Sequence, residues 1–335
     1  MDHTKRYGTF ALCREMAETP DVIRRFDENR VASLNLMSER VLLSGEGSSR
    51  IFPAKRMIAH ALREGWSQYI ATEGASQARE YDLSRTHLFV ASNSGRTAEG
   101  VHLIRSTSCA ATTGIVAHAG TPIATESDDA FILGCGPEEA VAATKSVVEQ
   151  ALVYDVLFRS ANGAPHLQRN ALADAFENAL GLDISRSIIE PIVKASTVYF
   201  AGRNDGVAEE LTLKANEIIR KRSDFLEGTY AVHGIEEVMR SGETVVLVDP
   251  FPEQEETFRT VLVDGVGLNV VAIAPRRTIF PTIVVDVPST PDSRELVPYI
   301  LLAAGWNLLI EVGIALGIDL DKPERARKVG NEFSG

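Results

Sequence analysis

The sequence predicts an α/β protein with two tandem, doubly wound parallel sheets of the flavodoxin-like kind, with helices on both faces of each sheet. Short apolar runs alternate with longer segments of helical periodicity along the 335 residues. Such runs are typical of parallel strands, which helices bury on both faces. The alternation restarts after residue 165, and each series has a strand followed by a glycine-containing turn, VLLSGEGSS at 41–49 and VYFAGRNDG at 198–206. We therefore predict an internal duplication.

The first half begins with residues 1–40, which are predicted to be mostly helical. Thr19-Pro20-Asp21 has the residue types of a helix start and predicts a helix at 21–39. Five apolar runs then predict strands at 40–45, 68–74, 86–92, 112–119 and 129–136. The intervening periodic segments predict helices at 49–65, 96–107 and 138–161.

The second half repeats this pattern with four apolar runs and four periodic segments. The predicted strands are 197–202, 243–250, 268–274 and 282–288, and the predicted helices are 173–195, 206–222, 253–267 and 293–317. Pro191 is expected to break or kink the first of these helices. The turn-forming residues 162–165 mark the expected boundary. Residues 1–165 form a helical lead-in and the first domain, and residues 166–335 form the second domain with a C-terminal tail.

The composition is that of a soluble globular protein, with 44% hydrophobic and 24% charged residues. The net charge of −12 and the absence of a Lys/Arg run argue against nucleic acid as the main partner. The charged N-terminus has no apolar signal core. The longest apolar segment, 296–318, carries Asn307 and Glu311, so we expect a buried helix and no membrane span. Three widely separated cysteines suit a reducing cytoplasm.

A cluster of hydroxyl and amide side chains follows one predicted strand, in the sequence SNSGRT at 92–97, which we call the cradle loop. Backbone N–H groups at a helix N-terminus and the helix dipole favour an anion there. The hydroxyl groups would add donors, and Gly95 would let the backbone approach a ligand. The alternative is that Ser92 or Ser94 caps the following helix. The loop taken alone leaves the two interpretations open.

Several segments taken together resemble the tandem sugar isomerase (SIS) family. The resemblance is strongest to the isomerase half of glutamine–fructose-6-phosphate amidotransferase and to its free-standing deaminase and deglycase relatives. It covers the chain from about Val41 onward. The family's motifs match a glycine turn, the cradle loop and a helix start. The candidate residues for binding the sugar phosphate are Gly47, Ser48, Ser49, Ser92, Asn93, Ser94, Arg96, Thr97, Val141, Ala143 and Lys214, although Arg96 stands where the family commonly has an acidic residue or Gln.

The resemblance also assigns catalytic residues. The family's Lys-x-x-Glu segment, which supplies the general base, matches Lys214 to Glu217. Its His-Gly pair matches His233 and Gly234, and its Asp-x-Pro tail with a following lysine places Lys328. The carboxylate would move the proton between two sugar carbons, and the imidazole would open the ring. Lys328 would stabilise enediolate charge or form an imine.

Each catalytic candidate also has a structural interpretation. Glu217 and Lys214 at i−3 have the spacing of a surface ion pair, and Lys328 ends the short basic segment RARK at 325–328. Arg96 either grips the anion or faces solvent. The sequence also departs from the family at Tyr230, Ile235 and Ala143, which puts the substrate in doubt more than the fold.

We therefore predict an enzyme that isomerises a phosphorylated hexose or amino sugar through an enediol(amine) intermediate, with or without loss of ammonia. The alternatives are a sugar carrying another terminal anion such as sulfonate, a sugar-phosphate-amine deglycase, and a non-catalytic sugar-phosphate sensor. No glutaminase nucleophile precedes the first sheet, which disfavours a glutamine-dependent synthase. No metal-ligand spacing appears, so we predict no metal and no cofactor. The partners expected are the anionic sugar and a second copy of the chain in a homodimer with composite active sites, with no nucleic acid and no membrane.

Overall fold

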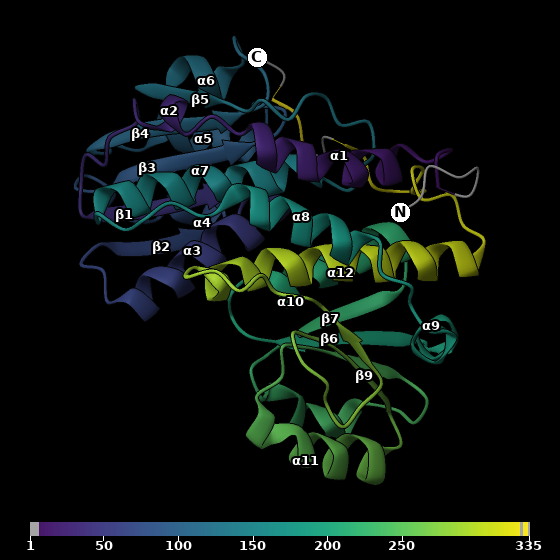
Figure 1. Ribbon diagram of the computed structural model, residues 1–335. Helices are drawn as coiled ribbons and strands as arrows, with labels where there is room; N and C mark the ends of the chain where they lie inside the picture. Colours follow the sequence, from purple (N-terminus) through teal and green to yellow (C-terminus); the bar gives the residue numbers. More distant parts are fainter. Residues whose placement is uncertain (1–6, 329–330, 334–335) are drawn as a thin grey trace. The chain divides into compact units, whose positions relative to one another are not determined.

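The computed structural model describes residues 7–328 and 331–333, and their strands form two parallel sheets of five strands each (Figure 1). The chain divides into two compact units, each built around one sheet. The first-sheet unit contains Asp21–Glu139, Ala143–Arg169 and Ala326–Gly335. The second-sheet unit contains Met1–Pro20, Ala140–Ala142 and Asn170–Arg325. The α/β fold class predicted from the sequence is confirmed.

The first sheet has the strand order β2-β1-β3-β4-β5, and every neighbouring pair is parallel. Leu42, Leu88 and Val90 on one face pack with residues of α4, α5 and α6, and Phe89 on the other face meets Tyr154 of α7. Helices therefore cover both faces, as Figure 1 shows. The elements are α2 Glu28–Val31, β1 Arg40–Gly45, α3 Ile51–Glu64, β2 Tyr69–Glu73, α4 Ala75–Ala78, β3 His87–Ser92, α5 Ala98–Ser106, β4 Ala111–Val116, α6 Pro122–Glu126, β5 Asp129–Ile132 and α7 Lys145–Ala161.

The second sheet has the order β10-β9-β8-β6-β7, which is the same topology counted from the other edge. Its strands are β6 Thr197–Gly202, β7 Arg222–Glu227, β8 Thr244–Val248, β9 Asn269–Ala274 and β10 Thr282–Val284. Its helices are α1 Ala11–Arg25, which continues into the first-sheet unit, α8 Arg169–Leu180, α9 Arg186–Lys194, α10 Val207–Lys214, α11 Glu255–Phe258 and α12 Ser293–Leu316. A π-helix, Arg259–Val266, continues α11.

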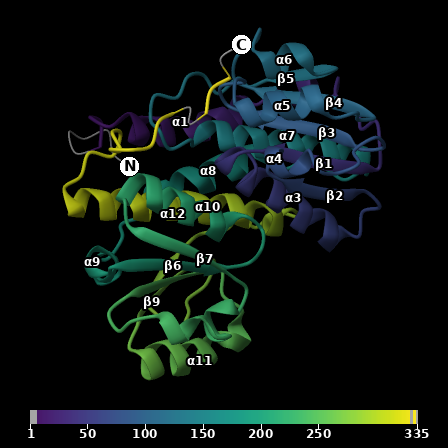
Figure 2. The same ribbon diagram turned by 180° about the vertical axis from the view of Figure 1, so that it is seen from behind.

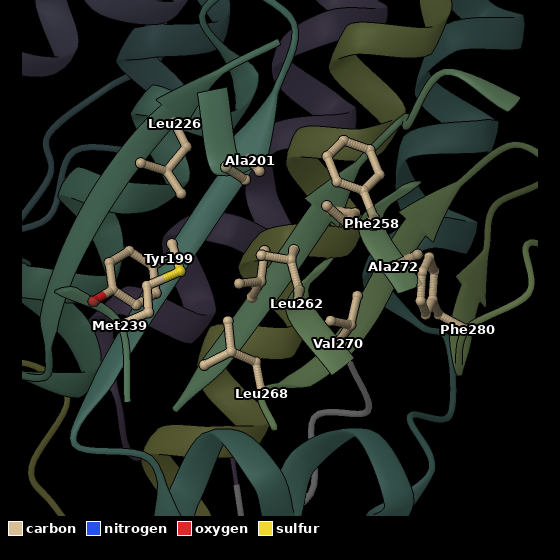
Figure 3. Packing of buried hydrophobic residues seen from close by; sticks show 13 residues of the cluster. Tyr199, Ala201, Leu226, Met239, Phe258, Leu262, Leu268, Val270, Ala272 and Phe280 are labelled. Carbon is tan, nitrogen blue, oxygen red and sulfur yellow. The ribbon is translucent and has the colours of Figure 1, made fainter. Parts of the chain in front are cut away.

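The two faces of the second sheet are buried by different helices (Figure 2). Figure 3 shows one face, where Tyr199 and Val270 from the strands meet Phe258 and Leu262 from α11 and the π-helix that follows. The other face packs against α10 and α12. By length and composition α12 is apolar enough to span a membrane, but 83% of its most apolar window is buried within the protein. The expectation of a buried helix at this segment is thus confirmed.

Several predicted elements differ from the structure. The helix predicted at 173–195 is two helices, α8 and α9, and Pro191 lies inside α9. The break falls before Ser185, whose hydroxyl accepts a hydrogen bond from the N–H of Ser187 and begins α9. The N-terminal helix begins at Ala11, ten residues before the predicted start. Asp321 explains this earlier start, because its carboxylate accepts hydrogen bonds from the N–H groups of Ala11 and Leu12 at 2.7 and 2.9 Å.

The third difference is a strand that the sequence did not indicate. The helix predicted at 206–222 ends early, and β7 follows it at the edge of the sheet. The strand sequence RSDFLE alternates between exposed and more buried residues and contains no apolar run. An edge strand pairs on one side only, so it needs fewer buried side chains than a central strand.

Candidate active site

The cradle loop is held in shape by its own hydroxyl groups. Ser92, the last residue of β3, accepts a hydrogen bond from the N–H of Gly95 at 3.1 Å. Its hydroxyl lies 2.8 Å from the hydroxyl of Thr97 and 3.4 Å from that of Ser94. Ser94 in turn accepts from the N–H of Arg96 at 3.2 Å. Neither serine caps α5, because the N-cap position is Thr97 and both serines bond within the loop.

Gly95 is the residue that allows this tight loop. Its φ is +65°, a conformation that side chains disfavour. A Cβ at this position would also come within 2.1 Å of the hydroxyl oxygen of Thr121. Backbone N–H groups can therefore lie close to a ligand here, which is the arrangement that binds anions before a helix.

The glycine turn Gly45–Ser49 follows β1, which pairs in parallel with β3. The turn and the cradle loop therefore lie at the same, carboxyl, end of the sheet, where the strand order reverses. A Cβ on Gly45 would lie 2.8 Å from the carbonyl oxygen of Ala91, so glycine permits this close approach of the two strand ends. Ser48 is buried and Ser49 is half-buried.

Glu138 is a site residue that the sequence analysis did not single out. Its side chain is fully buried. It accepts hydrogen bonds from the N–H of Thr144 at 2.8 Å and from the N–H and hydroxyl of Ser146 at 3.3 and 2.6 Å. Burial alone would raise the pKa of Glu138, but Lys328 and the donors at Ser146 and Thr144 outweigh it and lower the pKa. The carboxylate is therefore held in its charged form.

Glu138 also explains why α7 begins at Lys145 and not at residue 138 as predicted. Its carboxylate occupies the start of the helix and accepts the N–H groups that have no partner within the helix. Residues 138–144 consequently form a loop that includes Val141 and Ala143, both half-buried.

The C-terminal tail, which follows residue 317, contacts the cradle loop within the first-sheet unit. Lys328 Nζ lies 3.6 Å from Glu138 Oε2. Further along, Glu332 forms a β-bridge with Thr97, and the N–H of Phe333 donates to the carbonyl of Arg96 at 2.8 Å. The Arg96 guanidinium is 47% exposed and lies 4.0 Å from the Glu332 carboxylate. The structure thus brings Asn93, Arg96, Thr97 and Lys328 into one neighbourhood.

In the second-sheet unit, Lys214 and Glu217 form an ion pair at the end of α10. Lys214 Nζ lies 2.9 Å from Glu217 Oε2 and 3.3 Å from Oε1 of Glu210. Lys214 and Glu210 are fully buried, whereas the Glu217 side chain is 22% exposed. Burial would lower the pKa of Lys214, but the two carboxylates outweigh it and raise the pKa. This is not the solvated surface pair that the spacing alone suggested.

The backbone around Glu217 is irregular. Ala215–Ile219 is a π-helix, a rare form that is frequent at functional sites. Arg220, which ends it, has a φ of +53°, an unfavourable conformation for a residue with a side chain. Its guanidinium donates to the carbonyls of Asp319 and Lys322 in the tail, at 2.9 Å for Lys322. The residue that ends the Glu217 helix therefore also fixes the start of the tail.

His233 follows a single 3₁₀ turn, Tyr230–Val232, after β7, and its side chain is exposed. Within the described residues its imidazole has no hydrogen-bond partner, and its N–H donates to the carbonyl of Tyr230 at 3.1 Å. Tyr230 and Val238 in the same segment are 48% and 68% exposed. The segment thus presents an imidazole and apolar side chains to solvent.

Comparisons with known proteins give consistent results, although no protein-family model matches the chain. Glutamine–fructose-6-phosphate aminotransferase from Mycolicibacterium smegmatis is 26% identical over 370 residues, covering 96% of this chain. The chain spans 57% of the length of that relative. The structure of glucosamine-6-phosphate deaminase from Thermotoga maritima matches with a TM-score of 0.75 and 20% identity, covering 95% of this chain and 99% of the deaminase. The chain has the SIS fold.

A second SIS structure supports the same conclusion. Tagatose-6-phosphate ketose/aldose isomerase from Escherichia coli matches with a TM-score of 0.75 and 17% identity, covering 96% of this chain and 98% of the isomerase. The sequence relatives match through their isomerase (SIS) portion, as the resemblance predicted. Proteins with this SIS fold therefore include an isomerase and a deaminase of sugar phosphates.

Proposed function

We propose that the chain is an enzyme that acts on a phosphorylated hexose or amino sugar, moving the carbonyl between C1 and C2 with or without loss of ammonia. The Lys214–Glu217 pair is the observation that carries this proposal. A buried ammonium beside a partly exposed carboxylate suits proton transfer, and a sugar-phosphate sensor would not need Glu217 as a base. Relatives and structural neighbours that are named as sugar-phosphate isomerases, aminotransferases and deaminases support the same reaction class.

The proposed mechanism assigns one task to each group. The cradle loop and the glycine turn bind the phosphate through backbone N–H groups and hydroxyls, and Arg96 adds charge. His233 transfers a proton at the ring oxygen and opens the sugar. Glu217 removes a proton from one of the two sugar carbons and returns it to the other through an enediol or enediolamine. Lys328 stabilises the charge that develops on the sugar oxygen.

We also infer a homodimer in which His233 completes the site of the second copy. The exposed imidazole, Tyr230 and Val238 support this proposal, since an exposed apolar segment is what an interface buries. Sedimentation at assay concentration tests the dimer, and a monomer with full activity would contradict it.

A reducing cytoplasm is the proposed compartment, because in the described residues all three cysteines are free. Burial also raises the pKa of Cys13 to about 12, which keeps its thiol protonated and unreactive.

The test is incubation with hexose and hexosamine 6-phosphates in D₂O, followed by NMR and an ammonia assay. We expect exchange between aldose and ketose and deuterium at the carbon next to the carbonyl. Two further substrates test the alternative enzymes. Turnover of a sugar with a terminal sulfonate would indicate a different anion, and turnover of a sugar-phosphate-amine adduct would indicate a deglycase. Tight binding of a sugar phosphate without turnover of any of these substrates would contradict the proposed enzyme and favour a non-catalytic sugar-phosphate sensor.

A further inference from the structure

The two oxygens of the Glu138 carboxylate have different surroundings. Oε1 faces the beginning of α7, where it accepts from the N–H and hydroxyl of Thr144 and from the N–H of Ser146. Oε2 accepts from the Ser146 hydroxyl and also faces two predicted site residues. The side-chain amide of Asn93 donates to it at 3.1 Å, and Lys328 Nζ lies 3.6 Å away. One oxygen thus fixes the carboxylate, and the other contacts the cradle loop and the tail.

This arrangement holds the carboxylate in a single orientation. A buried charge is costly unless hydrogen bonds and an opposite charge compensate for it. Ser146 lies in the first turn of α7, and Thr144 is the residue before that helix. Helix α7 has 17 residues and is itself buried. The position of Oε2 is therefore set by the helix, and any group that pairs with Oε2 takes its position from α7.

Lys328 depends on this oxygen more than Asn93 does. It lies in the tail, where no helix or strand fixes its backbone. Its Nζ is shielded from solvent, and within the described residues no acceptor lies at hydrogen-bond distance. The ion pair with Glu138 places the ammonium, and in the part of the chain that the structure describes its N–H groups donate to no protein acceptor. Those N–H groups are what a developing oxyanion requires.

We propose that Glu138 is a positioning residue that holds Lys328 and Asn93 at the cradle loop through the same carboxylate oxygen. It does not touch the substrate itself. The proposal rests on the proposed function for what Lys328 does there, but the placement of Lys328 is a property of the protein without substrate. The two can therefore be tested separately.

The first experiment measures the reactivity of Lys328 without any turnover. Trace acetylation of the whole protein, followed by peptide mass spectrometry, is compared between wild type and Glu138→Gln. Glutamine keeps the shape and one oxygen for the α7 donors but removes the charge. We expect labelling of Lys328 to rise on the order of fivefold, the factor lost with a modest ion pair. Lys194, 76% exposed, is the internal reference.

Two further variants serve as controls. Glu139→Gln makes the same change at the neighbouring exposed glutamate and should leave Lys328 labelling unchanged. Glu138→Asp keeps the charge at a shorter reach, and its labelling should lie between wild type and Glu138→Gln. It also provides the test if the glutamine variant does not fold, as judged by circular dichroism. Unchanged labelling of Lys328 in both Glu138 variants would overturn the proposal.

The second experiment is a double-mutant cycle on kcat and KM with Lys328→Gln. If Glu138 acts through Lys328, Glu138→Gln should lower kcat in wild type and change it less than about twofold in the Lys328→Gln background. Additive losses would mean that Glu138 acts only through the stability of α7. A protein with no turnover would contradict the proposed function and leave the acetylation result standing.

Discussion

The two sheets have the same strand order but carry different chemistry at the place where that order reverses. In the first sheet, glycines and hydroxyl side chains predominate after β1 and β3, together with Glu46, Asn93 and Arg96. In the second sheet, Arg203 after β6 and Asp249 after β8 form an ion pair at 2.7 Å. The Arg203 guanidinium also stacks on Phe251 at 4.1 Å. The first sheet therefore presents hydrogen-bond donors at this end, whereas in the second sheet an ion pair links the loops after β6 and β8.

In both sheets the topology offers the same place for a site, and the loops differ in the side chains that they supply there. The residues that we propose for catalysis in the second-sheet unit lie instead in the helix after β6, with the Lys214–Glu217 pair, and in the segment after β7, with His233. The proposed function thus assigns anion binding to one sheet and proton transfer to the other, although both share the same strand order. Four predictions test this division.

The largest expected effect is the loss of proton transfer in the second-sheet unit. Glu217→Gln should lower kcat by roughly 10²–10⁴-fold, the usual contribution of general acid–base catalysis, with KM nearly unchanged. Steady-state kinetics measures this loss on whichever sugar phosphate of the panel the protein turns over. Glu190→Gln, at an exposed position on α9 of the same unit, is the matched control and should have wild-type kinetics. Full turnover by Glu217→Gln would mean that another base does the chemistry.

The second prediction concerns acid sensitivity, which should belong to the first-sheet unit. Burial lowers the pKa of His87 at the start of β3 to about 4, against the attraction of Asp128 and Asp129, and Thr244 occupies the equivalent place in β8. Because the pKa of His87 is lower in the folded protein, the free energy of unfolding is highest above about pH 6.5 and decreases as the pH falls toward 4. The loss amounts to about 3 kcal/mol.

Urea unfolding at pH 7, 5.5 and 4.5, with limited proteolysis to assign each unit, measures this loss. The variant His87→Gln should flatten the pH dependence of the first-sheet unit, and Thr244→Val in the second sheet should not. Equal acid sensitivity of the two units in wild type would contradict this assignment.

The third prediction concerns the cradle loop. Ser94→Ala should raise KM by roughly 10- to 150-fold with little change in kcat, because a hydrogen bond to a charged group contributes about 1.5–3 kcal/mol. Calorimetric titration with a sugar phosphate gives the same quantity as an affinity. Ser241→Ala, an exposed serine of the second-sheet unit, is the control. A kcat effect without a KM effect would place Ser94 outside the anion site.

The smallest expected effect tests the ion pair of the second sheet. Asp249 has a φ of +47°, so Asp249→Gly should be more stable than Asp249→Ala by about 1 kcal/mol. Both variants lose the pair with Arg203, which is partly exposed and contributes only about 0.2–1 kcal/mol. Thermal unfolding compares them. Neither should change KM, and a KM effect would show that this end of the second sheet also binds substrate.

Much of this architecture could be predicted from the sequence, because parallel strands buried on both faces are continuous apolar runs. The strand β7 could not, since its edge position leaves it polar. The cradle loop was indicated by residue types that suit an anion. Glu138 was not, because a carboxylate before a helix shows no sign of the partners at Asn93 and Lys328, which lie 45 residues before it and 190 after it. The roles of the individual site residues remain predictions that the experiments above test.

The contact between Asp321 and the beginning of α1 has a consequence for the synthesis of the protein. The first helix of the chain receives its capping carboxylate from a residue 310 positions later. The second-sheet unit contains residues from both ends of the chain, whereas all strands and helices of the first sheet lie between residues 21 and 169. On the ribosome, the first sheet can assemble while translation continues. Helix α1 must wait for its cap until Asp321 has emerged.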